Sequence, residues 1–261
     1  MKLWAFLIFL STVGTITVNA LANILPLNNR FTGEISDSIP NLFAPAGITF
    51  AIWGVIYLLL LLFAVYSLTL PNNYSPVKKQ IPLQLGPSYV LASLANSLWI
   101  FAWHWLELGL SLVIMIILLA SLIYLYLRIR EITRDWPTKA FGRVLLRTTF
   151  GVYLGWITVA TVANVTSLLV VSGFDGGSWA QPITLGVLVA VGIIGIVASW
   201  TTKDLGYQLV LIWALAGIAI KRLDPLVEPG APLVGYFAIG VAGVLAVLGI
   251  LSVVLDRYKS S

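Results

Sequence analysis

The sequence contains no cysteine, one histidine and few charged side chains. Only 10% of its 261 residues are Asp, Glu, Lys or Arg, whereas 59% are hydrophobic. Without cysteine there is no disulfide, no thiolate nucleophile and no cysteine-ligated metal or iron–sulfur cluster. A chain this apolar is not a soluble domain. In such a chain the basic residues behind the net charge of +5 orient the protein in a membrane. We therefore expect no nucleic acid as a partner.

Catalytic motifs are missing as well. The sequence has no GxSxG, HExxH or CxxCH, and no two carboxylates share an apolar segment, so the usual hydrolytic mechanisms lack their parts. The single histidine, His104, excludes bis-imidazole haem ligation. Because it stands between Trp103 and Trp105, we interpret it as an interfacial side chain in an aromatic belt, with ligand contact as the alternative. We expect no required cofactor and no metal. The missing catalytic motifs make an enzyme the less favoured class of protein.

Long apolar segments dominate the chain. A membrane-spanning helix needs about 20 predominantly apolar residues, and eight segments approach that length. They are residues 3–25, 45–70, 86–105, 108–129, 148–172, 182–200, 205–220 and 233–255. Because these segments are continuously apolar rather than alternating, a β-barrel is disfavoured. The sequence therefore predicts an all-α integral membrane protein with eight spans.

No Asp, Glu, Lys or Arg lies near the middle of any of these segments. Ion-coupled transporters and proton pumps usually bury such groups on their transport pathways, and a retinal Schiff base needs a lysine inside a helix. Transport driven by a titrating carboxylate and retinal-based light sensing are therefore disfavoured.

The basic residues test the number of spans independently, because Lys and Arg collect in cytoplasmic loops. With eight spans and the amino terminus inside, only Arg30, Lys221 and Arg222 of the 15 basic residues fall outside. Both termini are then cytoplasmic, and we expect the bacterial cytoplasmic membrane. The alternative of seven spans would put Arg257 and Lys259 outside.

The first apolar segment has two interpretations. Met1 and Lys2, the apolar run and the residues TVNA are typical of a cleavable signal peptide. Against this, the segment is long for a signal peptide, and Asn19 and Asn23 lie one helical turn apart, where both can face the interior of a bundle. We favour a helix that is retained.

Aromatic residues are abundant, with ten Trp, ten Tyr and eleven Phe. Trp53 and Trp156 lie about two turns inside their segments, too deep for an interfacial belt. A deep indole buries a large apolar face and leaves one N–H to satisfy. That suits either helix packing or the wall of a cavity for a flat apolar ligand, and both interpretations stay open for a single tryptophan.

Aromatic and amide residues recur at helical spacing in three segments. In ANSLW of the third segment, Asn96 and Trp99 are three residues apart. In YLGWITVATVAN of the fifth, steps of three, four and four place Tyr153, Trp156, Ala160 and Asn164 on one helix face. In PAGITFAIWGVIY of the second, we expect Pro45 to start the helix and Trp53 and Tyr57 to follow one turn apart.

On these motifs the sequence resembles the TspO or translocator-protein family, also called tryptophan-rich sensory proteins and peripheral benzodiazepine receptors. The resemblance covers roughly residues 1–172. Departures from the family pattern are Ala44 for the first proline of a pair, Thr49 for a phenylalanine and Ile56 for a leucine. The resemblance implies a five-helix bundle at residues 1–172, and we interpret residues 173–261 as a three-helix extension for packing or oligomerisation.

The resemblance also implies a pocket among the helices for a flat apolar ligand, such as a porphyrin, a sterol-like or another lipidic compound, with loop 26–44 as its lid. The implied ligand-binding residues are Pro45, Trp53, Tyr57, Asn96, Trp99, Tyr153, Trp156, Ala160 and Asn164. For the two asparagines we favour a role in tying helices together, because buried amides must find partners. Arg30, Glu34 and Asp37 of the loop are candidates to meet the polar end of a ligand, or belong to a solvated loop.

The expected partners are membrane lipids, a hydrophobic small-molecule ligand and, through the extension, a second copy in a homo-oligomer. Binding, sensing or transport of the ligand is the favoured function, and porphyrin is a candidate ligand rather than a cofactor. Two alternatives remain: a facilitator-type transporter of a neutral or amphipathic solute, and a membrane enzyme that converts a bound porphyrin or lipid. The basic loop 128–147 has a topological role, with binding of anionic lipid as the alternative.

Overall fold

The computed structural model describes residues 2–70, 81–227 and 231–260, with side chains described as far as residue 252. The described part is helical, without strands. Its α-helices are α1 (Lys2–Ile24), α2 (Thr32–Ser38), α3 (Ile52–Thr69), α5 (Ile81–His104), α6 (Leu108–Ile132), α7 (Phe141–Val171), α8 (Ala180–Thr202), α9 (Leu205–Leu223) and α10 (Pro232–Ser260). Short 3-10 turns are η1 (Leu27–Asn29), η2 (Gly47–Ala51) and η3 (Gly177–Trp179).

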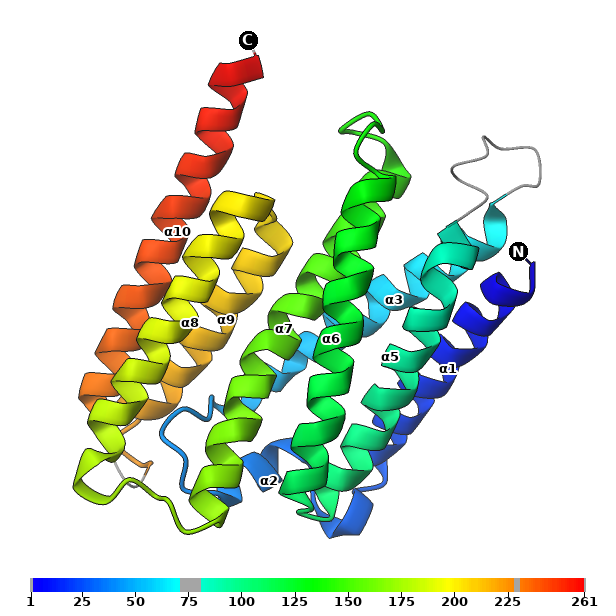
Figure 1. Ribbon diagram of the computed structural model, residues 1–261. Coiled ribbons are helices and arrows are strands. Elements are labelled where there is room, and N and C mark those ends of the chain that lie inside the picture. The colour runs from blue at the N-terminus through cyan, green and yellow to red at the C-terminus, as the bar shows by residue number, and fades with distance from the viewer. Residues whose placement is uncertain (1, 71–80, 228–230, 261) are drawn as a thin grey trace.

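Eight helices of the described part are long and apolar enough to cross a membrane, with α3 extended by η2. The predicted all-α membrane fold with eight spans is therefore confirmed. The start of α1 and the end of α10 lie at the same end of the molecule (Figure 1), as an even number of spans requires. That this end is cytoplasmic stays a prediction.

The spans form two adjoining groups (Figure 1). In the first group α1 packs on α3 and α5, α6 packs between α5 and α7, and α3 also contacts α7. In the second group α10 packs on α8 and α9. The two groups meet where α9 lies against α7. The last three spans are thus attached to the fifth span of the first group.

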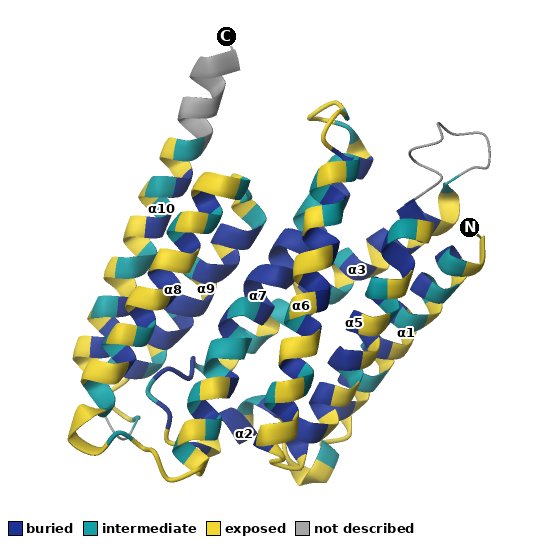
Figure 2. Ribbon diagram, viewed as in Figure 1, coloured by how far each residue is buried: buried dark blue, intermediate teal, exposed yellow. Residues whose placement is uncertain are grey.

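Exposed apolar side chains cover the outward faces of the spans, whereas buried residues lie where helices face one another (Figure 2). Apolar side chains on the outer faces suit a lipid environment, which provides no hydrophobic force between helices. Association then depends on close packing and hydrogen bonds. In the first group Phe63, Tyr89 and Phe150 pack edge to face with ring centroids 5.1–6.1 Å apart, and the Tyr89 hydroxyl lies 2.6 Å from the Thr12 hydroxyl.

Two glycines allow α7 and α9 to approach closely. A Cβ atom at Gly155 would lie 2.8 Å from the Tyr207 carbonyl oxygen, and one at Gly151 would lie 2.5 Å from the Asp204 carboxylate. Gly151 and Gly155 are one helical turn apart, so together they leave a flat strip on the surface of α7 against which α9 packs. Small residues at helix contacts of this kind are typical of membrane bundles.

The structure corrects the expected start of the second span. Pro45 does not begin a helix, because Ala46 after it is extended (ψ 148°) and donates its N–H to the Gly217 carbonyl oxygen of α9 at 3.0 Å. Helical structure starts with η2, and the α-helix starts at Ile52. The predicted loop 26–44 is also partly helical, since it contains η1 and α2.

His104 is another correction. It is fully buried at the end of α5 rather than exposed at an interface, and its Nδ1 lies 2.7 Å from the Ile100 carbonyl oxygen. Its own carbonyl oxygen accepts a hydrogen bond from Asn28 Nδ2 at 3.0 Å. His104 thus belongs to the packing between α5 and the segment that follows α1.

Candidate functional site

Trp53 on α3 is the centre of an aromatic cluster. Its ring stacks on Tyr57 with centroids 5.4 Å apart and planes 20° apart. The ring centroids of Trp99, Tyr153 and Trp156 lie 6.4, 6.1 and 6.2 Å from that of Trp53. The structure therefore brings together all five aromatic residues that the sequence motifs single out, from α3, α5 and α7.

Helical spacing explains the cluster. Trp53 and Tyr57 are four residues apart, so they lie on one face of α3 with their side chains in contact. The cluster also includes two aromatic residues that the motifs missed: Trp103 stacks on Trp99 at 5.7 Å, and Phe50 meets Trp156 edge to face at 5.8 Å. Trp103 was detectable, because it lies four residues after Trp99.

A cavity of about 430 Å³ lies beside Trp53. It is bordered by α1, α2, η2, α3 and α5 and is partly open. Its lining residues are Asn19, Asn23, Phe31, Thr32, Gly33, Glu34, Asp37, Gly47, Phe50, Trp53, Tyr57 and Ile100. The segment from Phe31 to Asp37, which contains most of α2, covers it in the place where the resemblance implied a lid.

The predicted site residues are divided between the cavity wall and a layer behind it. Trp53 and Tyr57 line the cavity. Trp99, Tyr153 and Trp156 are only 3–4% exposed and pack behind the Trp53 ring. The indole N–H groups of Trp99 and Trp156 have no hydrogen-bond partner among the described residues. Pro45 is buried outside the cavity lining.

The amides tie helices together. Asn96 Nδ2 donates to the Tyr153 hydroxyl at 2.9 Å, and Asn96 Oδ1 accepts from Asn19 Nδ2 at 2.8 Å, so one side chain links α1, α5 and α7. Asn164 Nδ2 donates to Ser111 Oγ at 2.8 Å and links α7 to α6, while Ala160 is partly buried against the core. Neither Asn164 nor Ala160 lines the cavity.

The charged groups of the cavity wall come from the lid. Glu34 accepts a hydrogen bond from the Phe31 N–H at 2.8 Å, which caps the start of α2. Asp37 forms an ion pair with Lys221 of α9. Arg30 is exposed and is not part of the lining. The cavity is thus apolar and aromatic on the α3 side and polar on the lid side. The described residues contain no group of three His, Cys, Asp or Glu that would hold a metal ion.

These features define a multi-pass helical membrane protein with an aromatic cluster and a lidded cavity inside its first group of helices. A family model described as "TSPO-like protein" matches residues 5–251, which is nearly the whole chain. The protein belongs to the TSPO-like protein family. The match runs past residue 172 through α8 and α9 into α10, so it is longer than the part that the motifs covered. No curated protein and no solved structure matches the chain.

Proposed function

We propose that the protein binds a flat, largely apolar ligand with a polar edge in the cavity between α1, α2, α3 and α5. Porphyrins, sterol-like and other lipidic compounds are the candidate class. The observation that carries the proposal is the cavity of about 430 Å³, walled by the stacked rings of Trp53 and Tyr57 and covered by α2. Small-molecule sites commonly have volumes of about 300–1,000 Å³ with aromatic walls and a few polar groups.

Each side of the cavity has a role in this proposal. The apolar face of the ligand lies against Trp53 and Tyr57, while Asn23 and Thr32 offer hydrogen bonds to its polar edge. Trp99, Tyr153 and Trp156 act from behind by fixing the Trp53 ring, and a wall held in place before binding loses less entropy when the ligand arrives. Because the acidic residues Glu34 and Asp37 lie on the lid side, carboxylates of a ligand would point away from the lid.

The orientation and location are part of the same proposal. We place the loops at the end that holds both termini in the cytoplasm, and the protein in the bacterial cytoplasmic membrane. The support is the distribution of Lys and Arg, most of which lie in the loops and chain ends on that side.

The test is a titration of the detergent-purified protein with protoporphyrin, followed by tryptophan fluorescence. Gly33→Leu is the informative variant, because Gly33 lines the cavity and a Cβ there meets nothing nearer than Gly47 Cα at 3.8 Å. The first added carbon therefore fits, and the rest of the side chain takes up ligand space. Gly14→Leu on α1 is the matched control, since a Cβ at Gly14 has no atom within 4 Å.

We expect saturable quenching for the wild type and for Gly14→Leu, and at least tenfold weaker binding for Gly33→Leu. Quenching that rises only linearly with porphyrin would contradict binding of this ligand. Equal affinity of Gly33→Leu and wild type would place the site elsewhere.

A further inference from the structure

One face of α9 makes polar contacts with the segment between the lid helix α2 and η2. Trp213, Gly217 and Lys221 follow one another at steps of four residues, so they lie along a single stripe of the helix. All three contact the stretch between Asp37 and Thr49. This stretch joins the lid helix α2 to η2, and η2 leads directly into the helix that carries Trp53.

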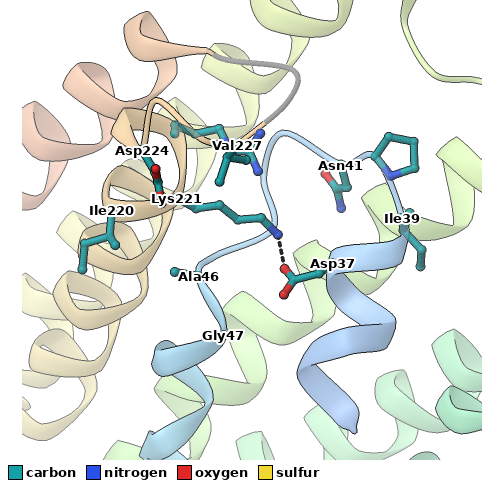
Figure 3. Close-up of a pocket in the computed structure, with 11 residues that line it drawn as sticks. Asp37, Ile39, Asn41, Ala46, Gly47, Ile220, Lys221, Asp224 and Val227 are labelled. Atoms are coloured by element: carbon teal, nitrogen blue, oxygen red, sulfur yellow. Dashed lines mark hydrogen bonds and ion pairs between the residues drawn. The ribbon is translucent and has the colours of Figure 1, made fainter. Parts of the chain in front are cut away.

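The contacts along the stripe are polar and close. Trp213 Nε1 donates to the Thr49 carbonyl oxygen at 2.9 Å, and the Gly217 carbonyl oxygen accepts from the Ala46 N–H at 3.0 Å. Lys221 completes the stripe through its ion pair with Asp37 (Figure 3). A Cβ atom at Gly217 would overlap the side chain of Thr49, which is fully buried. Only glycine allows α9 to come this near.

A second cavity, of about 270 Å³, lies beside the stripe. It is lined by Lys221 and its neighbours at the end of α9 on one side and by six residues of the stretch 37–47 on the other: Asp37, Ile39, Pro40, Asn41, Ala46 and Gly47 (Figure 3). Asp37 and Gly47 line both this cavity and the one next to Trp53. At these two residues the segment therefore separates the two cavities and has open space on both faces.

We propose that α9 holds the lid in place: Trp213, Gly217 and Lys221 are positioning residues that fix the segment Asp37–Thr49, which through its junction with α2 keeps the lid helix over the cavity and so limits ligand access. This inference rests on the proposed function for its ligand. It gives the three C-terminal helices a role in the site of the first five, because their contact with the lid reaches the cavity wall.

Lid opening can be measured without a ligand. The chain has no cysteine, so Ile100→Cys supplies a single thiol in the cavity lining at a position that is 1% exposed. Its rate of reaction with a small, membrane-impermeant thiol reagent reports how often the cavity opens. Leu118→Cys on α6, which is fully buried away from the cavity, reports general loosening of the fold.

In the Ile100→Cys background we expect Lys221→Gln to speed labelling about two- to fivefold, the range for loss of one partly exposed ion pair. The Lys221 side chain is 11% exposed and that of Asp37 50%. Asp37→Asn should give at least this increase, because Asp37 also interacts electrostatically with the buried Arg222, and adding Lys221→Gln to Asp37→Asn should give no further increase, since the ion pair is already lost. Lys221→Arg keeps the charge and should restore slow labelling. Arg30→Gln removes a charge from an exposed residue at the same end and should leave the rate unchanged.

Two results would overturn the inference. One is an unchanged labelling rate in Lys221→Gln, Asp37→Asn and Trp213→Phe. The other is an equal increase at Ile100→Cys and Leu118→Cys, because the substitutions would then loosen the whole fold. Failure of porphyrin to bind would contradict the proposed ligand and leave these labelling rates as they are, so the two proposals fail separately.

Discussion

Trp53 both faces the cavity and contacts four aromatic residues. Trp53→Phe keeps an aromatic ring in the cluster but shrinks the surface offered to a ligand. We expect it to weaken protoporphyrin binding about tenfold, equivalent to about 1.4 kcal/mol, which lies within the range of single aromatic contacts. Trp156→Phe should weaken binding less than about threefold, because Trp156 lies behind the wall. Both values come from fluorescence titration, and equal losses would show that Trp53 is a packing residue only.

Asn96 joins three helices through two buried hydrogen bonds. Asn96→Ala leaves the Tyr153 hydroxyl and the Asn19 amide without this partner, so we expect a loss of about 1–2 kcal/mol in the free energy of unfolding. Tyr153→Phe should cost less, because it removes one of the two bonds and keeps the ring. The double variant should be less destabilised than the sum of the single changes. Thermal or denaturant unfolding in detergent measures these differences, and strict additivity would count against the network.

We expect Asp204 to make the stability depend on pH. It caps α9 by accepting the Tyr207 N–H at 3.1 Å, and it also accepts the Tyr126 hydroxyl at 2.8 Å. Burial raises the pKa of the Asp204 carboxyl above its ordinary value. The folded state therefore favours the protonated form, and the stability that protonation provides is full below the ordinary aspartate pKa of about 4 and is lost as pH rises through the folded value.

Asp204→Asn should remove this dependence, because asparagine also caps helices. Measured by thermal unfolding between about pH 4 and pH 8, the variant should gain on the wild type as the pH rises. Parallel curves for the two proteins would show that the carboxyl does not titrate differently on folding.

At the scale of helices, the contact between α7 and α9 depends on small residues. Gly155→Ala places a Cβ 2.8 Å from the Tyr207 carbonyl oxygen, so the backbone of one helix must move. Overpacking of this kind costs about 1–3 kcal/mol. Gly240→Ala on α10 is the control, since a Cβ there has no atom within 4 Å. We expect a lower melting temperature in detergent for Gly155→Ala alone, and similar melting of the two variants would contradict the close contact.

The spans were predictable because each depends on a local run of apolar residues, although α5 and α7 begin several residues before the predicted segments, at Ile81 and Phe141. Spacings of three or four residues predicted which aromatic residues share a face of each helix, and the family resemblance implied that these faces meet. The conformation at Pro45 was not predictable, because the Ala46 N–H donates to the Gly217 carbonyl oxygen, far along the chain. The lid helix and its ion pair to Lys221 were missed for the same reason: sequence spacing shows which residues share a face, but not which distant helix that face meets.

For the molecule as a whole, the orientation in the membrane is testable because the chain has no cysteine. Ser178→Cys in η3 and Thr138→Cys between α6 and α7 place exposed thiols at opposite ends of the molecule. In intact bacterial cells expressing the protein, an impermeant maleimide should label Ser178→Cys and spare Thr138→Cys until the membrane is permeabilised. The reverse pattern would place both termini outside.

The division at residue 172 into a five-helix domain and a three-helix extension stays a prediction. What the structure shows is that α9 contacts both α7 and the lid segment, and the family match spans the two parts.

The aromatic cluster also has an optical consequence. Trp156, Trp53, Trp99 and Trp103 form a chain of indoles with neighbouring centroids 6.2, 6.4 and 5.7 Å apart. At such separations the electronic transitions of adjacent rings couple through space and give paired circular-dichroism bands of opposite sign. Because Trp156, Trp53 and Trp99 come from three different helices, the bands of the Trp156–Trp53 and Trp53–Trp99 pairs exist only while α3, α5 and α7 are assembled. The protein thus carries its own unlabelled spectroscopic reporter of the state of its interior.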